Sequence, residues 1–395
     1  MRSTKSDTKK LSTGSVLFSL GLRPFFLFGV IWVVVAMVLW LLALAGAIDL
    51  PTRFDPVSWH AHAFLFGYMG AVLAGFLLTA VPNWTGRPPL AGAPLAALFW
   101  LWVAGRVAVL TSALTSALAP VVVDLAFPAV LGGYILREII AGKNWRNLIV
   151  LGMLTIFAAA NLIFHLEALT GQATAFGLRL GLATVVMMIS VIGGRIVPSF
   201  TKNWLFKQDK DARPAPPMQR YDKLTLMFSV ATLSAWVVWP DDRLSGAFLL
   251  VMGVLHAIRL ARWQGHRTLA EPLIFVLHAA YAFVPLGAIA LGLDILTGSH
   301  ATVATQHLWM AGAIGAMTLA VMTRATLGHT GRALHADTMT VVIYLALLGS
   351  VVTRLVAVFL PGMIHASGAF WILAFGGFAL IYGPMLLRPP LGDAT

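Results

Sequence analysis

The chain has 395 residues, of which 59% are hydrophobic and only 11% are charged, and it contains no cysteine. An ordinary soluble domain is excluded, because its surface would need far more charged residues. The lack of cysteine excludes disulfides, thiolate-held iron–sulfur clusters, thioether-attached haem and a thiolate copper centre. Any metal ion must therefore be held by His, Met, carboxylate or backbone ligands.

The apolar residues come in runs of about twenty, the length that crosses ~30 Å of hydrocarbon at about 1.5 Å per residue. We predict an all-α membrane protein of about twelve transmembrane helices, separated by Pro, Gly and Asp. Residues 1–24 and 388–395 are predicted tails, without a cleavable signal peptide, and 25–387 a single membrane domain. The predicted spans are 25–47, 58–81, 94–112, 115–137, 145–169, 175–197, 223–240, 244–262, 270–295, 302–327, 337–360 and 365–387.

The net charge is +12, and the placement of the Lys and Arg residues along the chain predicts the orientation. With both termini in the cytoplasm, only Arg53 and Arg243 fall in outer loops, and Arg106, Arg179 and Arg354 fall within spans. The other basic residues, every lysine among them, lie in cytoplasmic segments or at cytoplasmic helix ends. This pattern follows the positive-inside rule for a bacterial inner-membrane protein. We expect the basic charge to meet anionic lipid, and we expect no nucleic-acid partner.

Two segments align without gaps: His62 to Arg87 (HAFLFGYMGAVLAGFLLTAVPNWTGR) and His307 to Arg332 (HLWMAGAIGAMTLAVMTRATLGHTGR). Both begin with His, share two spaced glycines and close on Thr-Gly-Arg. The sixth span ends in GGRIVPSFTKNW, whose Asn-Trp matches that of the second span. These matches predict three pseudo-symmetric repeats of four helices, 25–137, 145–262 and 270–387, with the second, sixth and tenth helices equivalent. The alternative is a chance alignment of Gly- and Ala-rich helices.

Histidines gather in the predicted outer half of the membrane, where an ionisable residue is costly and usually functional. His60 and His62 point about 200° apart on a regular helix, so they cannot chelate one ion, but they can serve two sites, such as a haem and a second metal. His62 and His307, on equivalent helices, are expected to face each other in a geometry suited to axial haem ligation. His165 is a further candidate ligand at this depth. The alternative for His60 is an interfacial residue beside Trp59.

Each of the other ionisable residues within the spans has two possible roles. His278 is a candidate ligand with Tyr281 as proton donor on the same helix face, or it makes a helix–helix hydrogen bond. Arg106, Arg179 and Arg354 either anchor haem propionates or pair with acids, for which the candidates are Asp124, Glu167 and Asp294. We expect interfacial positions for the remaining membrane histidines, which are His256, His266, His300 and His365.

Several motifs together resemble the NnrS family: LRPFF from Leu22, WHAH from Trp59, FLLTAVPNWTGRPPLAG from Phe76, GGRIVPSFTKNWL from Gly193 and MTRATLGHTGR from Met322. The resemblance runs from Arg23 to about Pro384. It implies a polytopic protein with haem and copper that is linked to nitric oxide and nitrosative stress in denitrifying and related bacteria. Family members often carry Glu after the second His of WHAH, and Ala63 takes that place here.

Two functions are weighed from these observations. The first is a haem- and copper-binding protein that binds or turns over nitric oxide near the outer face, with electrons from quinol or a partner protein. Three arcs of four helices with His on the second and tenth would be similar to the catalytic subunits of haem–copper oxidases, although the chain has no adjacent His-His pair. The alternative is a secondary transporter without a redox metal, whose repeats form a rocking bundle.

Overall fold

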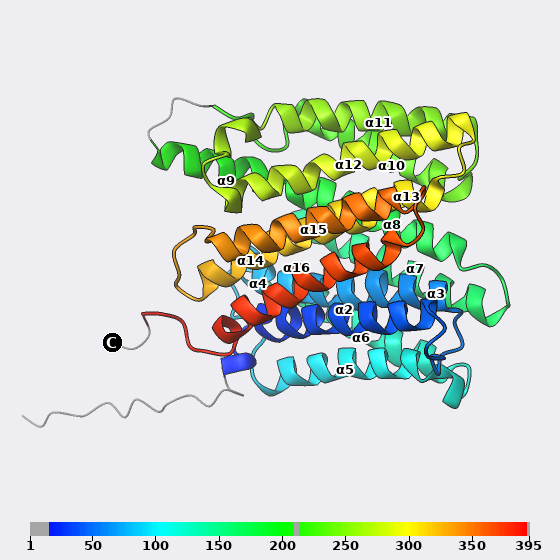
Figure 1. Ribbon diagram of the computed structural model, residues 1–395. Helices are drawn as coiled ribbons and strands as arrows, with labels where there is room; N and C mark the ends of the chain where they lie inside the picture. The colour runs from blue at the N-terminus through cyan, green and yellow to red at the C-terminus, as the bar shows by residue number, and fades with distance from the viewer. Residues whose placement is uncertain (1–15, 209–212, 393–395) are drawn as a thin grey trace, which may run out of the picture.

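Antiparallel helices joined by short loops make up the structure, a computed structural model that describes residues 16–208 and 213–392 (Figure 1). No strand occurs among these residues, and the prediction of an all-α membrane protein of about twelve helices is confirmed. Nine of the long helices are regular from end to end. They are α2 (Leu22–Leu44), α5 (Ala93–Leu110), α6 (Ala119–Ala141), α7 (Leu148–Leu169), α10 (Arg220–Val238), α11 (Arg243–Ala261), α12 (Pro272–Thr297), α15 (Thr338–Val356) and α16 (Met363–Leu386).

Three further helices each contain a π-helical segment, and we call them the interrupted helices. Their parts are α3 (Pro56–His62), η1 (Ala63–Tyr68) and α4 (Met69–Thr85); α8 (Ala175–Met188), η4 (Ile189–Gly193) and α9 (Gly194–Lys207); and α13 (Thr302–His307), η6 (Leu308–Gly315) and α14 (Ala316–His329). They are the second, sixth and tenth long helices, which were predicted from the sequence to be equivalent. They are also the most buried of the candidate spans in the described chain.

Within the described residues, eleven helices are long and apolar enough to cross a membrane, so the chain is a multi-pass membrane protein. The remaining long helix, α10, falls short of this hydropathy because its first turn carries the charged residues Arg220, Asp222 and Lys223. Further along the helix, the hydroxyl side chains of Thr225, Ser229 and Thr232 are buried and therefore shielded from lipid.

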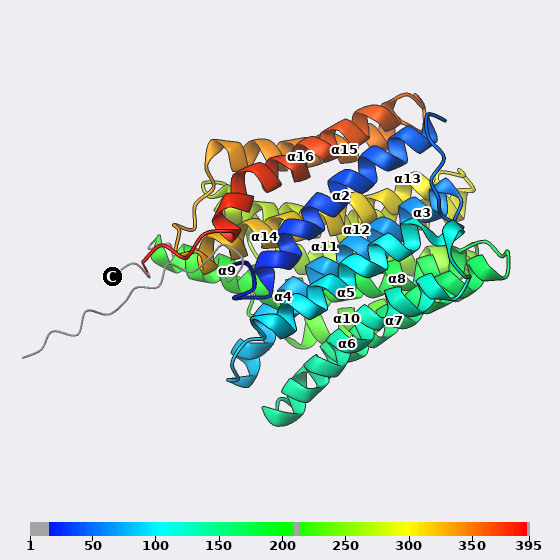
Figure 2. The same cartoon turned by 90° about the horizontal axis from the view of Figure 1, so that it is seen from below.

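The last helix packs against the first and closes the bundle, as Figure 2 shows for α16 and α2. Arg23 fixes this contact, because its guanidinium donates to the backbone carbonyls of Leu386 and Arg388 at 2.8 Å each. The start of α2 and the end of α16 therefore lie at the same end of the bundle, which we call the terminal end. The opposite end, where α3 and α13 begin, is the far end (Figure 1).

The predicted helix boundaries differ from the observed ones in two informative places. The fourth span begins at Ala119 and not at residue 115, because Ser112–Leu114 form a short 3₁₀ turn and Pro120 occupies the first turn of α6. The second and sixth helices continue through Pro82 and Pro198, where the sequence predicted them to end. Neighbouring helices support such prolines in a membrane bundle, although each removes one backbone donor.

Candidate metal centre

The local sequence explains how His62 is placed at the far end. Asp55 caps α3 by accepting hydrogen bonds from the backbone N–H groups of Val57 and Ser58, and Pro56 starts the helix with the required backbone angle. The π-helical segment η1 begins directly after His62, at Ala63. Segments of this kind are frequent at functional sites, because the extra residue per turn re-aims the side chains beside them.

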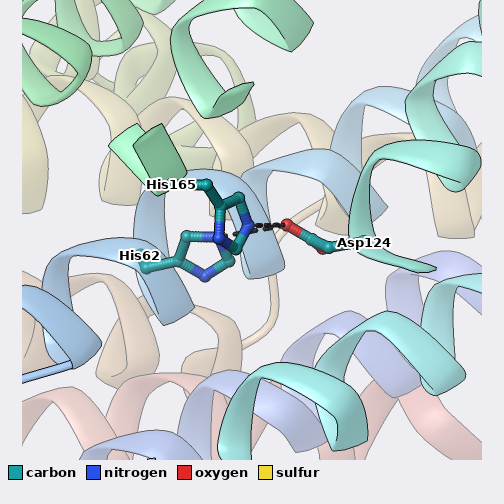
Figure 3. Close-up of side chains that lie close together, drawn as sticks. All are labelled: His62, Asp124 and His165. Atoms are coloured by element: carbon teal, nitrogen blue, oxygen red, sulfur yellow. Dashed lines mark hydrogen bonds and ion pairs between the residues drawn. The ribbon is translucent and has the colours of Figure 1, made fainter. Parts of the chain in front are cut away.

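His62, Asp124 and His165 converge from three helices onto one point (Figure 3). His62 Nε2 lies 3.1 Å and His165 Nε2 lies 3.0 Å from the same oxygen, Asp124 Oδ2. Their three ligand atoms all lie within 4.8 Å of one another, and each residue is at most 3% exposed. Asn161 completes the group by donating to Asp124 Oδ2 at 2.8 Å, with its own carbonyl oxygen 3.0 Å from His62 Nε2.

Arg106 supplies the positive charge that compensates the buried carboxylate of Asp124. Its guanidinium donates to Asp124 Oδ1, the oxygen that the histidines do not use. Gly67 makes room for it, since a Cβ at that position would lie 2.6 Å from Arg106 Nη1. Gly105 lets α5 approach α6, because a Cβ there would lie 3.2 Å from Asp124 Cα. Of the two interpretations of Arg106, the structure favours the ion pair with Asp124.

Aromatic rings and a cavity surround this cluster. Phe54 packs on both imidazoles, with ring centroids 5.5 Å from His62 and 5.6 Å from His165. A cavity of about 260 Å³ separates His165 from the far-end loops and is also lined by Arg53 and Ser112. A small molecule at the far end can therefore come close to His165 without crossing the whole bundle.

The cluster is suited to a metal ion by the chemistry of its donors. Two imidazole nitrogens and a carboxylate oxygen are ligands that first-row transition metals accept. Asn161 and Arg106 already hold the carboxylate by hydrogen bonds, as partners outside the ligand shell do in metalloproteins. In the structure as it stands, the hydrogen bonds through Asp124 Oδ2 hold the two imidazoles in place.

A second group at the far end contains His60, His307 and Arg354, which are close enough to interact electrostatically. The ring of His60 stacks on Trp40 with centroids 4.9 Å apart, and its buried Nδ1 has no hydrogen-bond partner among the described residues. His307 Nδ1 lies 2.6 Å from the carbonyl oxygen of Val303. We expected His62 to face His307, but the histidine near His307 is His60.

The remaining candidate residues lie apart from both groups. His278 is near the terminal end, with Nε2 2.7 Å from Thr201 Oγ1, which is the helix–helix hydrogen bond considered above. Arg179 is half-buried and donates to the carbonyl of Val237. The hydroxyl of Tyr281 contacts His256 and Arg259, and no hydrogen bond to His278 is seen in the described chain. His256 is fully buried, so its expected interfacial position was wrong.

Asp124 and Asn161 were not predicted from the sequence to belong to the site. Asp124 was considered only as an ion-pair partner for an arginine. The signal that could have identified it is a carboxylate early in the apolar helix α6, far from the acidic Glu138 at the other end. Asn161 lies one helical turn before His165 on α7, so the two share a face.

A comparison with protein-family models matches the family described as NnrS protein over residues 16–389. The chain belongs to the NnrS family. This match covers nearly the whole sequence and includes His62, Asp124 and His165. No match was found among curated proteins.

Proposed function

We propose that this membrane protein of the NnrS family binds or turns over nitric oxide at a copper ion held by His62, Asp124 and His165. The observation that carries the proposal is the convergence of these three ligand atoms within 4.8 Å, inside a bundle that is otherwise mostly apolar. Ionisable groups inside a membrane protein are costly and usually functional. The link to nitric oxide comes from the family alone.

The charges around the cluster support copper over a hard divalent cation. Arg106 and Asp124 cancel each other's charge, so a bound ion keeps its own charge inside the bundle. A singly charged Cu(I) ion then leaves less net charge buried than a divalent ion does. Imidazole ligands suit copper, whereas Mg²⁺ and Ca²⁺ prefer sites made of oxygen.

Haem, the second cofactor that the resemblance implies, has its best position at His60 and His307. His60 offers a buried ring nitrogen without a hydrogen-bond partner among the described residues, and Arg354 is a nearby cation that can pair with a propionate. Ferrous haem bound there would supply an iron that takes nitric oxide as a ligand. His165 belongs to the copper site in this proposal, and His278, Tyr281, Arg106 and Arg179 contribute to structure.

The repeats and the orientation also belong to the proposal. The π-helical segments η1 and η6 begin directly after His62 and His307, and both Thr-Gly-Arg motifs place a left-handed glycine, Gly86 and Gly331, at the helix end. These shared features support equivalent repeats in 25–137 and 270–387. The basic residues support cytoplasmic termini and a bacterial inner membrane, with the metal cluster near the outer face. Nitric oxide is small and uncharged and reaches such a site through lipid, while electrons come from quinol or a partner protein.

The test is metal and haem content of the purified protein, together with its spectrum before and after nitric oxide is added. We expect His62→Ala and His165→Ala to lose copper, whereas His365→Ala, an exposed histidine at the same end, keeps it. His60→Ala and His307→Ala should lose haem absorbance and retain copper. A folded wild-type protein without either cofactor would overturn the proposal. Solute flux by that metal-free protein in proteoliposomes would establish the alternative, a secondary transporter.

A further inference from the structure

The three interrupted helices meet around a cavity of about 60 Å³ that takes no part in the metal cluster. Each helix contributes one methionine to its wall: Met69 from α4, Met188 from α8 and Met317 from α14. Each of these methionines lies within two residues of a π-helical segment. The π-helical segments of the three helices therefore lie beside this cavity.

The wall offers nothing that would hold water. Its one side-chain polar group is the hydroxyl of Thr318, which donates to the carbonyl of Ile314 at 2.8 Å and accepts from the hydroxyl of Tyr68 at 2.8 Å. A buried water needs two to four polar partners, and cavities without them stay dry and take apolar occupants. The cavity is therefore a place for an uncharged molecule that makes no strong hydrogen bond.

The size of the cavity limits the occupant. It is smaller than an engineered cavity of about 150 Å³ that holds benzene or xenon, but larger than the ~10–15 Å³ that a cavity needs to hold one water. A haem does not fit in that space. Toward the terminal end, the lining residues Phe76, Ile196 and Val321 are only half-buried, one on each helix, so the cavity opens in that direction.

We propose that this cavity is a binding site for one small uncharged gas molecule, such as a diatomic gas, between the three interrupted helices. The site needs no metal, because none of its lining residues belongs to the copper or haem positions proposed above. Methionine suits the role, since its side chain is polarisable and adapts to irregular space. The proposal extends the function to a second place in the molecule where a gas can reside.

Xenon is the probe, because it is apolar, of similar size and visible by its anomalous scattering. Crystals of the full chain under xenon pressure should show a peak between Met69, Met188 and Met317. Gly193→Ala should remove most of this peak. Gly193 lines the cavity, and its added Cβ would lie 3.5 Å from Tyr281 and 3.7 Å from Met317, which are ordinary contacts. The variant should therefore fold.

Gly376→Ala is the matched control, since this half-buried glycine of α16 lies away from the cavity and has open space around it. It should keep the full xenon peak. Val321→Ile adds a methylene from a different helix and should weaken the peak as well, which guards against a folding defect of the first variant. Absence of xenon from this position in the wild type, or an undiminished peak in both filled variants, would overturn the proposal. Neither outcome depends on whether the protein binds copper or haem.

Discussion

His60 and His62 are two residues apart on α3, yet their side chains meet different neighbours. His62 Nε2 lies 3.1 Å from Asp124 Oδ2, whereas the ring of His60 stacks on Trp40 with centroids 4.9 Å apart. Residues i and i+2 of a helix point about 200° apart, so one short helix can serve two sites. The two histidines are therefore separable by mutation.

Asp124→Asn should abolish copper binding and also destabilise the protein. Asp124 is the carboxylate that balances Arg106, whose side chain is only 5% exposed. Breaking a buried ion pair from one side costs about 3–5 kcal/mol, because an uncompensated charge is left inside. Thermal unfolding in detergent measures this loss. The double variant Arg106→Met with Asp124→Asn should recover much of the stability but no copper, and wild-type stability of the single variant would contradict the argument.

Gly67→Ala should disturb the cluster without changing any of its ligands. The new Cβ would lie 2.6 Å from Arg106 Nη1 and 2.9 Å from Trp32 Nε1, so the guanidinium must move away from Asp124. Overpacking of this kind costs roughly 1–3 kcal/mol, and copper affinity should fall with it. Gly70→Ala is the control on the same interrupted helix, because its Cβ meets only Phe127, at 3.7 Å. Equal copper affinity in the two variants would show that Arg106 does not position the site.

Much of the fold could be predicted from the sequence, because the length of an apolar run reports directly on membrane crossing. The aligned glycines Gly67 and Gly312 also mark positions where only a glycine fits without a clash. A Cβ at Gly67 would meet Arg106, and one at Gly312 would lie 2.5 Å from Phe283. Both mark places where a neighbouring side chain lies directly against an interrupted helix.

The composition of the metal cluster could not be predicted in the same way. The neighbours that a helix face meets depend on the rotation of the helix about its own axis. Hydropathy does not reveal this rotation when the helix is apolar on all sides. The π-helical segment η1 adds to this, because it breaks the regular period of 3.6 residues just after His62. The sequence therefore identified His62 and His165 as candidates, but not the carboxylate of Asp124 that joins them.

Tyr281→Phe should destabilise the terminal end and leave the copper content unchanged. The hydroxyl of Tyr281 accepts from Arg259 and lies 2.8 Å from His256 Nδ1, and both partners are fully buried. Each buried polar group that loses its partner costs about 1–3 kcal/mol. Tyr382→Phe removes one hydroxyl contact, to Thr340, and should cost less. If copper or haem were lost in Tyr281→Phe at an unchanged melting temperature, the tyrosine would act at a cofactor and not as part of a structural network.

Asp55→Ala tests the cap of the helix that carries both His60 and His62. Partial burial acts to raise the pKa of Asp55, but hydrogen bonds from Ser58 and Val57 outweigh it and hold the pKa below its ordinary value. A carboxyl with a lowered pKa stabilises the fold above its unfolded pKa, and this contribution disappears as the pH falls through the folded pKa. Losing such a cap costs about 1 kcal/mol at neutral pH.

The difference in melting temperature between wild type and Asp55→Ala should therefore shrink as the pH falls from about 7 to about 3. Asp337→Ala removes a similar cap from α15, where Asp337 accepts from the N–H of Thr340. Both variants should lose comparable stability, but only Asp55→Ala should weaken copper binding, because α3 carries the ligand His62 and α15 carries no ligand of the cluster. A pH-independent difference would mean that Asp55 acts through its shape and not through its charge.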